Sequence, residues 1–85
     1  MSITVRYFAA VREQLGSSET LCWADTGAHT VGELRQWLIG RSAAHAAALD
    51  LGNGLRTACN QTMCGADQAV QDGDEVAFFP PVTGG

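Results

Sequence analysis

The chain has 85 residues, 46% of them hydrophobic and 16% charged, which predicts one small globular domain with a modest core. Nine acidic residues outweigh five arginines, lysine is absent and the net charge is −4, so no basic cluster is available to bind nucleic acid. No apolar run has the length of a transmembrane helix, and the first residues lack a signal-peptide layout. The sequence therefore predicts a cytoplasmic location, with neither nucleic acid nor a membrane as partner.

The first part of the chain is predicted to form a strand, a short helix and a second strand. Residues 2–8 alternate between apolar and polar positions, as a half-buried strand does, but Phe8 falls on the polar face. A short helix is predicted over residues 9–15, with Gly16 at its C-terminal end. The second strand is predicted over residues 19–24.

The clearest helix is predicted from Thr30 to Arg41. Thr30 and Glu33 have the spacing of a capping box, in which two side chains bond backbone N–H groups at the start of a helix. Apolar residues then recur at helical spacing, which predicts a core-facing stripe made of Val31, Leu34 and Leu38. The alanine-rich segment 43–49 is predicted to add a further turn or two of helix.

Strands are predicted to form most of the remaining chain. A turn at Asp72-Gly73 precedes the last of three further strands, which are predicted at residues 55–60, 62–64 and 74–79. The order of elements favours an α+β fold of the β-grasp, ubiquitin-like type, a roll whose mixed sheet has one main helix packed across it. Residues 1–81 are interpreted as this domain, and residues 82–85 as a flexible, extended C-terminal tail.

The C-terminal residues have the most informative pattern. Pro80-Pro81 lack N–H donors and end a sheet ladder, so the residues after them are predicted to extend away from the domain. The segment ends in Gly84-Gly85, and glycine has no side chain to obstruct a narrow channel. From Pro81 the tail can reach about 13–14 Å. The pattern predicts a terminal carboxylate that is presented to the active site of another protein.

Two aromatic residues fall on strand faces that are otherwise polar. In the last strand Val76 and Phe78 share one face and Phe79 lies on the other, while Phe8 has the equivalent place in the first strand. If these strands are neighbours, Phe8 and Phe79 form one exposed patch beside the tail, and such patches usually mark a partner surface. The alternative is that each ring lies under a loop.

The sequence predicts neither a metal site nor catalytic machinery, and no stably bound cofactor. Cys22, Cys59 and Cys64 include no Cys-x-x-Cys pair and match no zinc spacing with His29 or His45, so they are interpreted as ordinary thiols. A GxxxxGK-type phosphate loop and a GxGxxG motif are both absent. No Ser/His/Asp set or carboxylate pair indicates catalysis.

Several segments make the chain resemble the small subunits of molybdopterin synthase, a family of ubiquitin-like sulfur carriers. The most specific is DGDEVAFFPPVTGG at residues 72–85. Weaker matches are VRYFA and VRE within residues 5–13, VGELR at residues 31–35 and NQT at residues 60–62. Residues 39–56 carry little of the resemblance.

The resemblance implies a definite chemistry at the terminus. A carboxylate is a poor electrophile, so in the family an adenylating enzyme uses ATP and magnesium to make an acyl-adenylate of the terminal glycine. A persulfide-bearing sulfur donor then replaces AMP and leaves a thiocarboxylate. Within molybdopterin synthase, this group donates its sulfur to a pterin precursor. The resemblance thus makes Gly85 the modified residue and Gly84 its slim neighbour, in a subunit that is not catalytic alone.

The resemblance also implies partners and a surface that binds them. The expected partners are the large subunit, in a heterotetramer, together with the adenylating enzyme and the sulfur donor. In the family, hydrophobic contacts with the first two fall at the positions of Phe8, Met63 and Phe79. With the tail included, the predicted partner-binding residues are Phe8, Met63, Phe79, Pro80, Pro81, Val82 and Thr83.

Three other functions are compatible with parts of the pattern. A sulfur carrier of the thiamine pathway would share the fold and the Gly-Gly end, although its tail does not usually contain Phe-Phe-Pro-Pro-Val. A ubiquitin-like protein modifier would end as an isopeptide on target lysines. A plain interaction module would have an inert tail.

Overall fold

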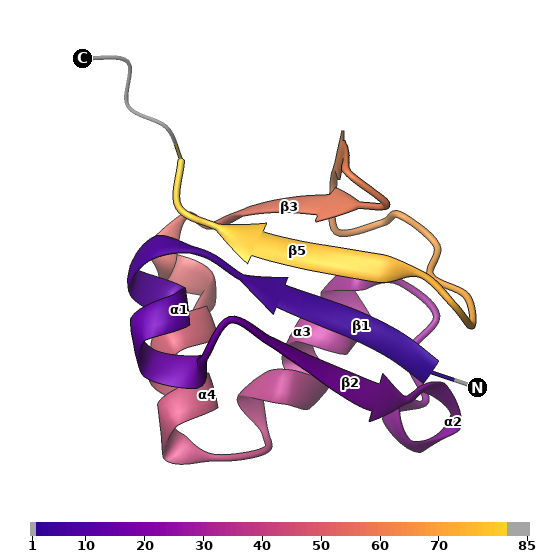
Figure 1. The fold of residues 1–85 in the computed structure, drawn as a ribbon, viewed down its shortest axis with the longest axis horizontal. Helices are drawn as coiled ribbons and strands as arrows, with labels where there is room; N and C mark the ends of the chain where they lie inside the picture. Colours follow the sequence, from indigo (N-terminus) through magenta and orange to yellow (C-terminus); the bar gives the residue numbers. More distant parts are fainter. Residues whose placement is uncertain (1, 82–85) are drawn as a thin grey trace.

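Five strands form one mixed sheet, with helices packed against one of its faces (Figure 1). The computed structural model describes residues 2–81. The strands lie in the order β2-β1-β5-β3-β4, so the first and last strands of the chain are neighbours at the centre of the sheet. The elements in chain order are β1 (Ser2–Tyr7), α1 (Ala9–Leu15), β2 (Ser18–Cys22), α2 (Trp23–Thr26), α3 (Val31–Ile39), α4 (Ala43–Leu49), the 3₁₀ turn η1 (Leu51–Asn53), β3 (Arg56–Cys59), β4 (Thr62–Cys64) and β5 (Glu75–Phe79).

The pairing of β1 with β5 decides the topology. The two strands are parallel, with Val5 opposite Val76 and Tyr7 opposite Phe78. A tight turn cannot join parallel strands, so every other element lies in the long crossover between them. The remaining strand pairs are antiparallel. This arrangement is the β-grasp, ubiquitin-like fold, and it confirms the predicted α+β class and mixed sheet.

The core lies between the inner face of the sheet and helices α1, α3 and α4. Strand alternation directs Val5, Tyr7 and Phe78 inward, and each is at most 1% exposed. The rings of Tyr7 and Phe78, which are opposite one another in the ladder, stack with centroids 6.4 Å apart. The stripe predicted for the main helix is buried as expected and consists of Val31, Leu34 and Leu38. Burial of these side chains is the main stabilising contribution to a domain of this size.

The start of α3 confirms the predicted cap, with one difference. Thr30 Oγ1 accepts a hydrogen bond from the Glu33 N–H at 3.1 Å, as in a capping box. The Glu33 carboxylate reaches back to the N–H of His29 at 2.8 Å, one residue before the helix cap. The bridge between Thr30 and Ala69 holds this entry to the helix against the loop before β5. No helix within residues 2–81 has both the length and the apolar character needed to cross a membrane.

One predicted strand is a helix in the structure over part of its length. The second strand ends at Cys22, and Trp23 and Ala24 belong to the short helix α2, so the strand predicted over 19–24 was wrong at its C-terminal end. A left-handed Gly27, with φ of 60°, ends that helix. The predicted helix at 43–49 is confirmed as α4, and it packs beside α1 and α3. The helical layer is therefore broader than one main helix.

A polar network ties β2 to the segment around α4. The Glu19 carboxylate accepts hydrogen bonds from the Tyr7 hydroxyl at 2.7 Å and from Arg41 at 2.6 Å, and its Oε2 lies 2.9 Å from His45 Nε2. Burial opposes ionisation of Glu19, but the hydrogen bonds from His45, Tyr7 and Arg41 outweigh it and lower the pKa of this carboxyl. Burial and the bond to Glu19 raise the pKa of Tyr7. His45 is thus part of a structural network.

Candidate partner-binding site

A row of small and flexible side chains crosses the outer face of the sheet. In the strand register Met63 lies opposite Ala58, Ala58 opposite Ala77, and Ala77 opposite Arg6. All four side chains point away from the helices, because residues opposite one another in a ladder share a face. Ala58 and Ala77 have only a methyl group above the sheet, so the protein surface is recessed there, between the longer side chains of Met63 and Arg6 that project at the two ends of the row.

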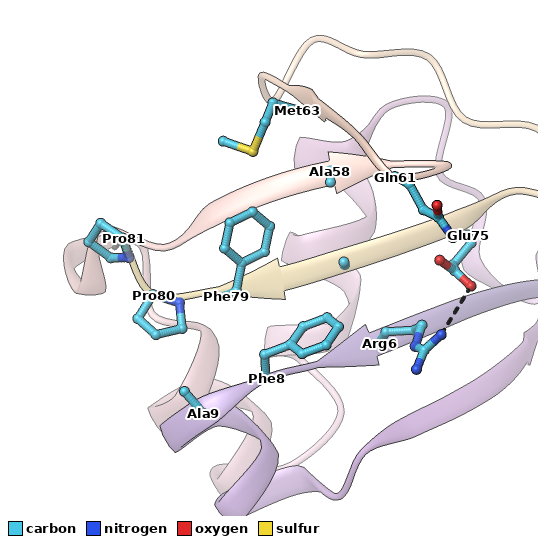
Figure 2. Close-up of a pocket in the computed structure, with 11 residues that line it drawn as sticks. Arg6, Phe8, Ala9, Ala58, Gln61, Met63, Glu75, Phe79, Pro80 and Pro81 are labelled. Atoms are coloured by element: carbon cyan, nitrogen blue, oxygen red, sulfur yellow. Dashed lines mark ion pairs between the residues drawn. The ribbon is translucent and has the colours of Figure 1, made fainter. Parts of the chain in front are cut away.

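The low middle is the floor of an apolar hollow of about 650 Å³ (Figure 2). Its apolar walls are Met63, Phe8 and Phe79, and Pro80 and Pro81 close one end. Met63 is 58% exposed and Phe8 is 41% exposed. The rings of Phe8 and Phe79 meet edge to face with centroids 6.4 Å apart. The predicted common patch of Phe8 and Phe79 is thus confirmed, although Phe79 is half-buried.

The end of β1 explains why Phe8 faces the hollow. Phe8 keeps extended backbone angles, and its N–H donates to the carbonyl oxygen of Phe78 at 3.2 Å, so it continues the alternation one step beyond Tyr7. Ala9 then has a left-handed φ of 55°, which turns the chain sharply into α1. A non-glycine residue in this region is uncommon, and its methyl group lines the hollow beside the prolines.

The other end of the hollow is polar. Arg6 Nη1 lies 3.7 Å from Glu75 Oε2, and the Arg6 guanidinium lies 5.8 Å from the centroid of the Phe8 ring. The side chain of Gln61 reaches this end from the turn between β3 and β4 (Figure 2). Because Arg6 and Glu75 pair with each other, this end has little net charge. The hollow can therefore receive an apolar side chain at one end and a neutral polar group at the other.

The hollow lies where the chain leaves the sheet. Residues Pro80 and Pro81 follow β5 directly and are half-buried and exposed, respectively. The other predicted tail residues, Val82, Thr83, Gly84 and Gly85, lie outside the described residues. Of the predicted site, the structure thus brings together Phe8, Met63, Phe79, Pro80 and Pro81.

The three thiols are placed as structural residues within the described chain. Cys22 is exposed, Cys64 is half-buried and Cys59 is buried, and none forms a disulfide with another. Burial and the nearby Asp74 carboxylate raise the pKa of the Cys59 thiol, which keeps it protonated and a weak nucleophile. Residues 2–81 contain no cluster of three His, Cys, Asp or Glu side chains that could hold a metal ion.

Six residues that line the hollow were not identified as site residues from the sequence: Arg6, Ala9, Ala58, Gln61, Glu75 and Ala77. The alanines gave no signal, because a small residue forms a floor only when larger neighbours stand around it. The strand alternation places Arg6 and Ala77 on the same face as Phe8 and Phe79, respectively, but it does not show that they lie opposite each other in the sheet. Gln61 was part of the NQT segment in the resemblance, which was the one available signal.

Comparison with known proteins gives consistent results. Residues 5–85 match the model of the ThiS family. The chain is 49% identical over 83 residues to the molybdopterin synthase sulfur carrier subunit of Escherichia coli strain K12, covering 98% of this chain and 99% of the relative.

Solved structures of similar chains have the same fold. Small archaeal modifier protein 1 of H. volcanii is 27% identical with a TM-score of 0.71, covering 95% of this chain and 98% of that one. A second match is a chain in the protein–protein complex of subunits 1 and 2 of molybdopterin-converting factor from Helicobacter pylori 26695. It is 26% identical with a TM-score of 0.66, and both chains are fully covered.

Proposed function

Because the chain belongs to the ThiS family, we propose that it is a sulfur carrier for molybdopterin synthesis, with sulfur carried on the carbonyl carbon of Gly85. The observation that carries the proposal is the position of the apolar hollow at the root of the tail. Pro80 and Pro81 line the hollow, and the sequence runs from them to Gly84-Gly85. A protein bound at the hollow would receive the terminus within about 13–14 Å of Pro81. Similarity to the E. coli sulfur carrier subunit supports the choice of pathway.

The proposed chemistry has two stages at Gly85. First, an adenylating enzyme uses its substrates ATP and Mg²⁺ to join the terminal carboxylate to AMP, with release of pyrophosphate. Second, the terminal sulfur of a donor's persulfide attacks the carbonyl carbon and the bond to AMP breaks. A thiol then reduces the acyl disulfide and leaves the thiocarboxylate. Activation is required because an ionised carboxylate resists nucleophilic attack.

The hollow is the proposed docking site for the large subunit and for the adenylating enzyme. The exposed Phe8, the half-buried Phe79 and the exposed Met63 are of residue types that are enriched at interfaces, and methionine adapts to different partners. The H. pylori chain of the same fold was solved in a complex with its subunit 2, which supports a large-subunit partner here. A heterotetramer of two chains of each kind is the proposed assembly. Residue Cys59, with its raised pKa, is not proposed as a sulfur carrier.

A second candidate function is that of a protein modifier. The similarity to small archaeal modifier protein 1 favours it, since a modifier would use the same activated terminus. In that case the acyl group would pass to a lysine amine of another protein and not to sulfur. The chain itself has no lysine, so it could not receive a second copy on any side chain.

The proposal is tested by the intact mass of the chain after incubation with the adenylating enzyme of the same organism, MgATP and a persulfide donor. We expect one oxygen to be replaced by sulfur, only when ATP is present. The charged chain should then lose its sulfur to the large subunit and its pterin precursor, and not to the recipient of the thiamine pathway. An unchanged mass, or conjugates with lysine-bearing proteins in place of sulfur transfer, would refute the sulfur-carrier function.

A further inference from the structure

The turn between β3 and β4 contains two adjacent left-handed residues that are not glycine. Asn60 has φ of 51° and Gln61 has φ of 69°, and they form a two-residue loop because Cys59 pairs with Thr62. Two-residue hairpins with positive φ at both positions strongly prefer Asn-Gly, because glycine reaches the second conformation without a steric penalty. Asparagine is therefore the expected residue at the first position, and Gln61 is the locally unfavourable choice at the second.

The bonds of Asn60 explain its own conformation but leave that of Gln61 unexplained. The Asn60 amide donates to Asp74 Oδ1 at 3.0 Å and accepts from the Glu75 N–H at 3.0 Å, so this side chain is anchored within the domain. The side chain of Gln61 is exposed and extends into the polar end of the hollow. Backbone strain of this kind is concentrated at functional sites, where the side chain contributes to something other than folding.

The surroundings of Gln61 define what it can bind. Arg6 and Glu75 form an ion pair beside it, so a charged partner group would lose its hydration without meeting an unpaired opposite charge. A carboxamide offers both a donor and an acceptor, which is the same pair of groups that a peptide unit offers. The neighbouring floor of Ala58 and Ala77 admits the apolar side chain next to such a peptide unit.

We propose that Gln61 is a specificity-determining residue that hydrogen-bonds a main-chain peptide group of the molybdopterin synthase large subunit, while an apolar side chain of that subunit fills the hollow. The inference rests on the proposed function, since it concerns the same docking site. It predicts that glycine at position 61 gives the more stable free domain, whereas glutamine gives the higher affinity for the large subunit.

The test measures the affinity of the purified large subunit of the same organism for variants of this chain by titration calorimetry, together with their melting temperatures. We expect Gln61→Gly to melt at or above the wild-type temperature and to bind about five- to tenfold more weakly, which corresponds to one or two lost hydrogen bonds. Gln61→Ala, which keeps a Cβ in the left-handed region, should lose the same affinity. Gln14→Ala removes an exposed glutamine of α1 that does not line the hollow, and it should change neither quantity.

The variant Gln61→Glu tests whether the partner group that Gln61 binds is neutral or cationic. It keeps the size and one acceptor but places a charge beside Glu75, so we expect it to bind more weakly than the wild type. Stronger binding of Gln61→Glu, or wild-type affinity of both Gln61→Gly and Gln61→Ala, would overturn the inference. Phe79→Arg is measured in parallel: if the wild type binds, Phe79→Arg does not, and Gln61→Ala binds normally, only the role of Gln61 fails. If the wild type itself does not bind, the docking function and this inference fail together.

Discussion

Strand β5 presents two aromatic neighbours to two different environments. Phe78 is 0% exposed beneath the helices and stacks on Tyr7, whereas Phe79 faces outward and meets Phe8 at the edge of the hollow. The inner face is completed by the chain's own helices. The outer face has apolar residues of similar kinds but no covering element among the described residues (Figure 1). The strand alternation therefore separates the residues that stabilise the fold from those that are available for a partner.

This separation means that the two faces should respond differently to the same kind of substitution. A change on the inner face leaves a cavity or a buried charge in the free domain. A side chain introduced on the outer face is solvated in the free domain, so it changes the free energy of binding to a partner more than the stability of the fold. Of the five predictions below, which run from the largest expected effect to the smallest, the first two test this difference directly, and the other three concern the tail, a polar network and the thiols.

Phe78→Ala should have the largest effect, on stability. Removing a fully buried phenylalanine costs about 3–5 kcal/mol, a large share of the about 5–15 kcal/mol that stabilises a typical domain. The matched outer-face variant, Phe79→Ala, should lose only about 1 kcal/mol, mainly its contact with Phe8. Urea unfolding followed by circular dichroism measures both. Equal losses for the two variants would contradict the separation of the faces.

Phe79→Arg should reverse the pattern by sparing the fold and removing partner binding. The arginine is solvated in the free domain, but in a complex it would be buried without a counter-charge, at a cost of about 3 kcal/mol or more in binding free energy. Calorimetric titration with the large subunit and with the adenylating enzyme measures the loss, and the melting temperature serves as control. If Phe79→Arg unfolds while Phe78→Arg is tolerated, the assignment of inner and outer faces is reversed.

Gly84→Val concerns neither face, because the residue lies beyond the described sheet. It adds a branched side chain where only backbone is expected to pass into a partner's active site, and it restricts the accessible φ and ψ. We expect a melting temperature close to wild type and formation or use of the thiocarboxylate slowed about a hundredfold, since small misplacements have large kinetic effects. Mass spectrometry over a time course measures the rate. A normal rate for this variant would exclude a threaded tail.

Glu19→Gln should have a smaller, pH-dependent effect on stability. Because the folded-state pKa of Glu19 lies below its ordinary value of 4.5, its contribution is present above that pH and is lost as the pH falls through the folded pKa. At neutral pH we expect the variant to lose about 1 kcal/mol, reduced by solvent screening of the exposed Arg41 partner. Urea unfolding at several pH values should show the difference from the wild type shrinking as the pH falls below 4.5. A difference that grows in acid would contradict the network.

Replacing all three cysteines by serine should have the smallest effect on function. The Cys59 thiol is kept protonated, and the proposed sulfur site is Gly85, so sulfur loading should continue at the wild-type rate. Some stability is lost at the buried Cys59 position, and Cys22→Ser with Cys64→Ser serves as the milder control. A folded triple variant that is adenylated but never gains sulfur would show that a thiol takes part.

The local patterns of the sequence determined most of the elements. Alternation identified β1 and β5 and the faces of their residues, because side chains in a strand point to opposite sides in turn. The cap at Thr30 and the stripe behind it located α3. The prolines and the Gly-Gly end, read together with the resemblance, indicated the family. These signals depend on neighbours within a few residues, which a single sequence displays directly.

The tertiary structure alone decided which of these elements meet. Phe8 and Phe79 lie 71 positions apart in the printed sequence, and their contact exists because β1 pairs in parallel with β5. The same is true of the floor made by Ala58 and Ala77, which depends on the register of β3 against β5. The end of β2 was misjudged because Trp23 fits a strand pattern locally, whereas packing places it in α2. Strand order and register come from burial summed over the whole domain, and no local pattern contains that sum.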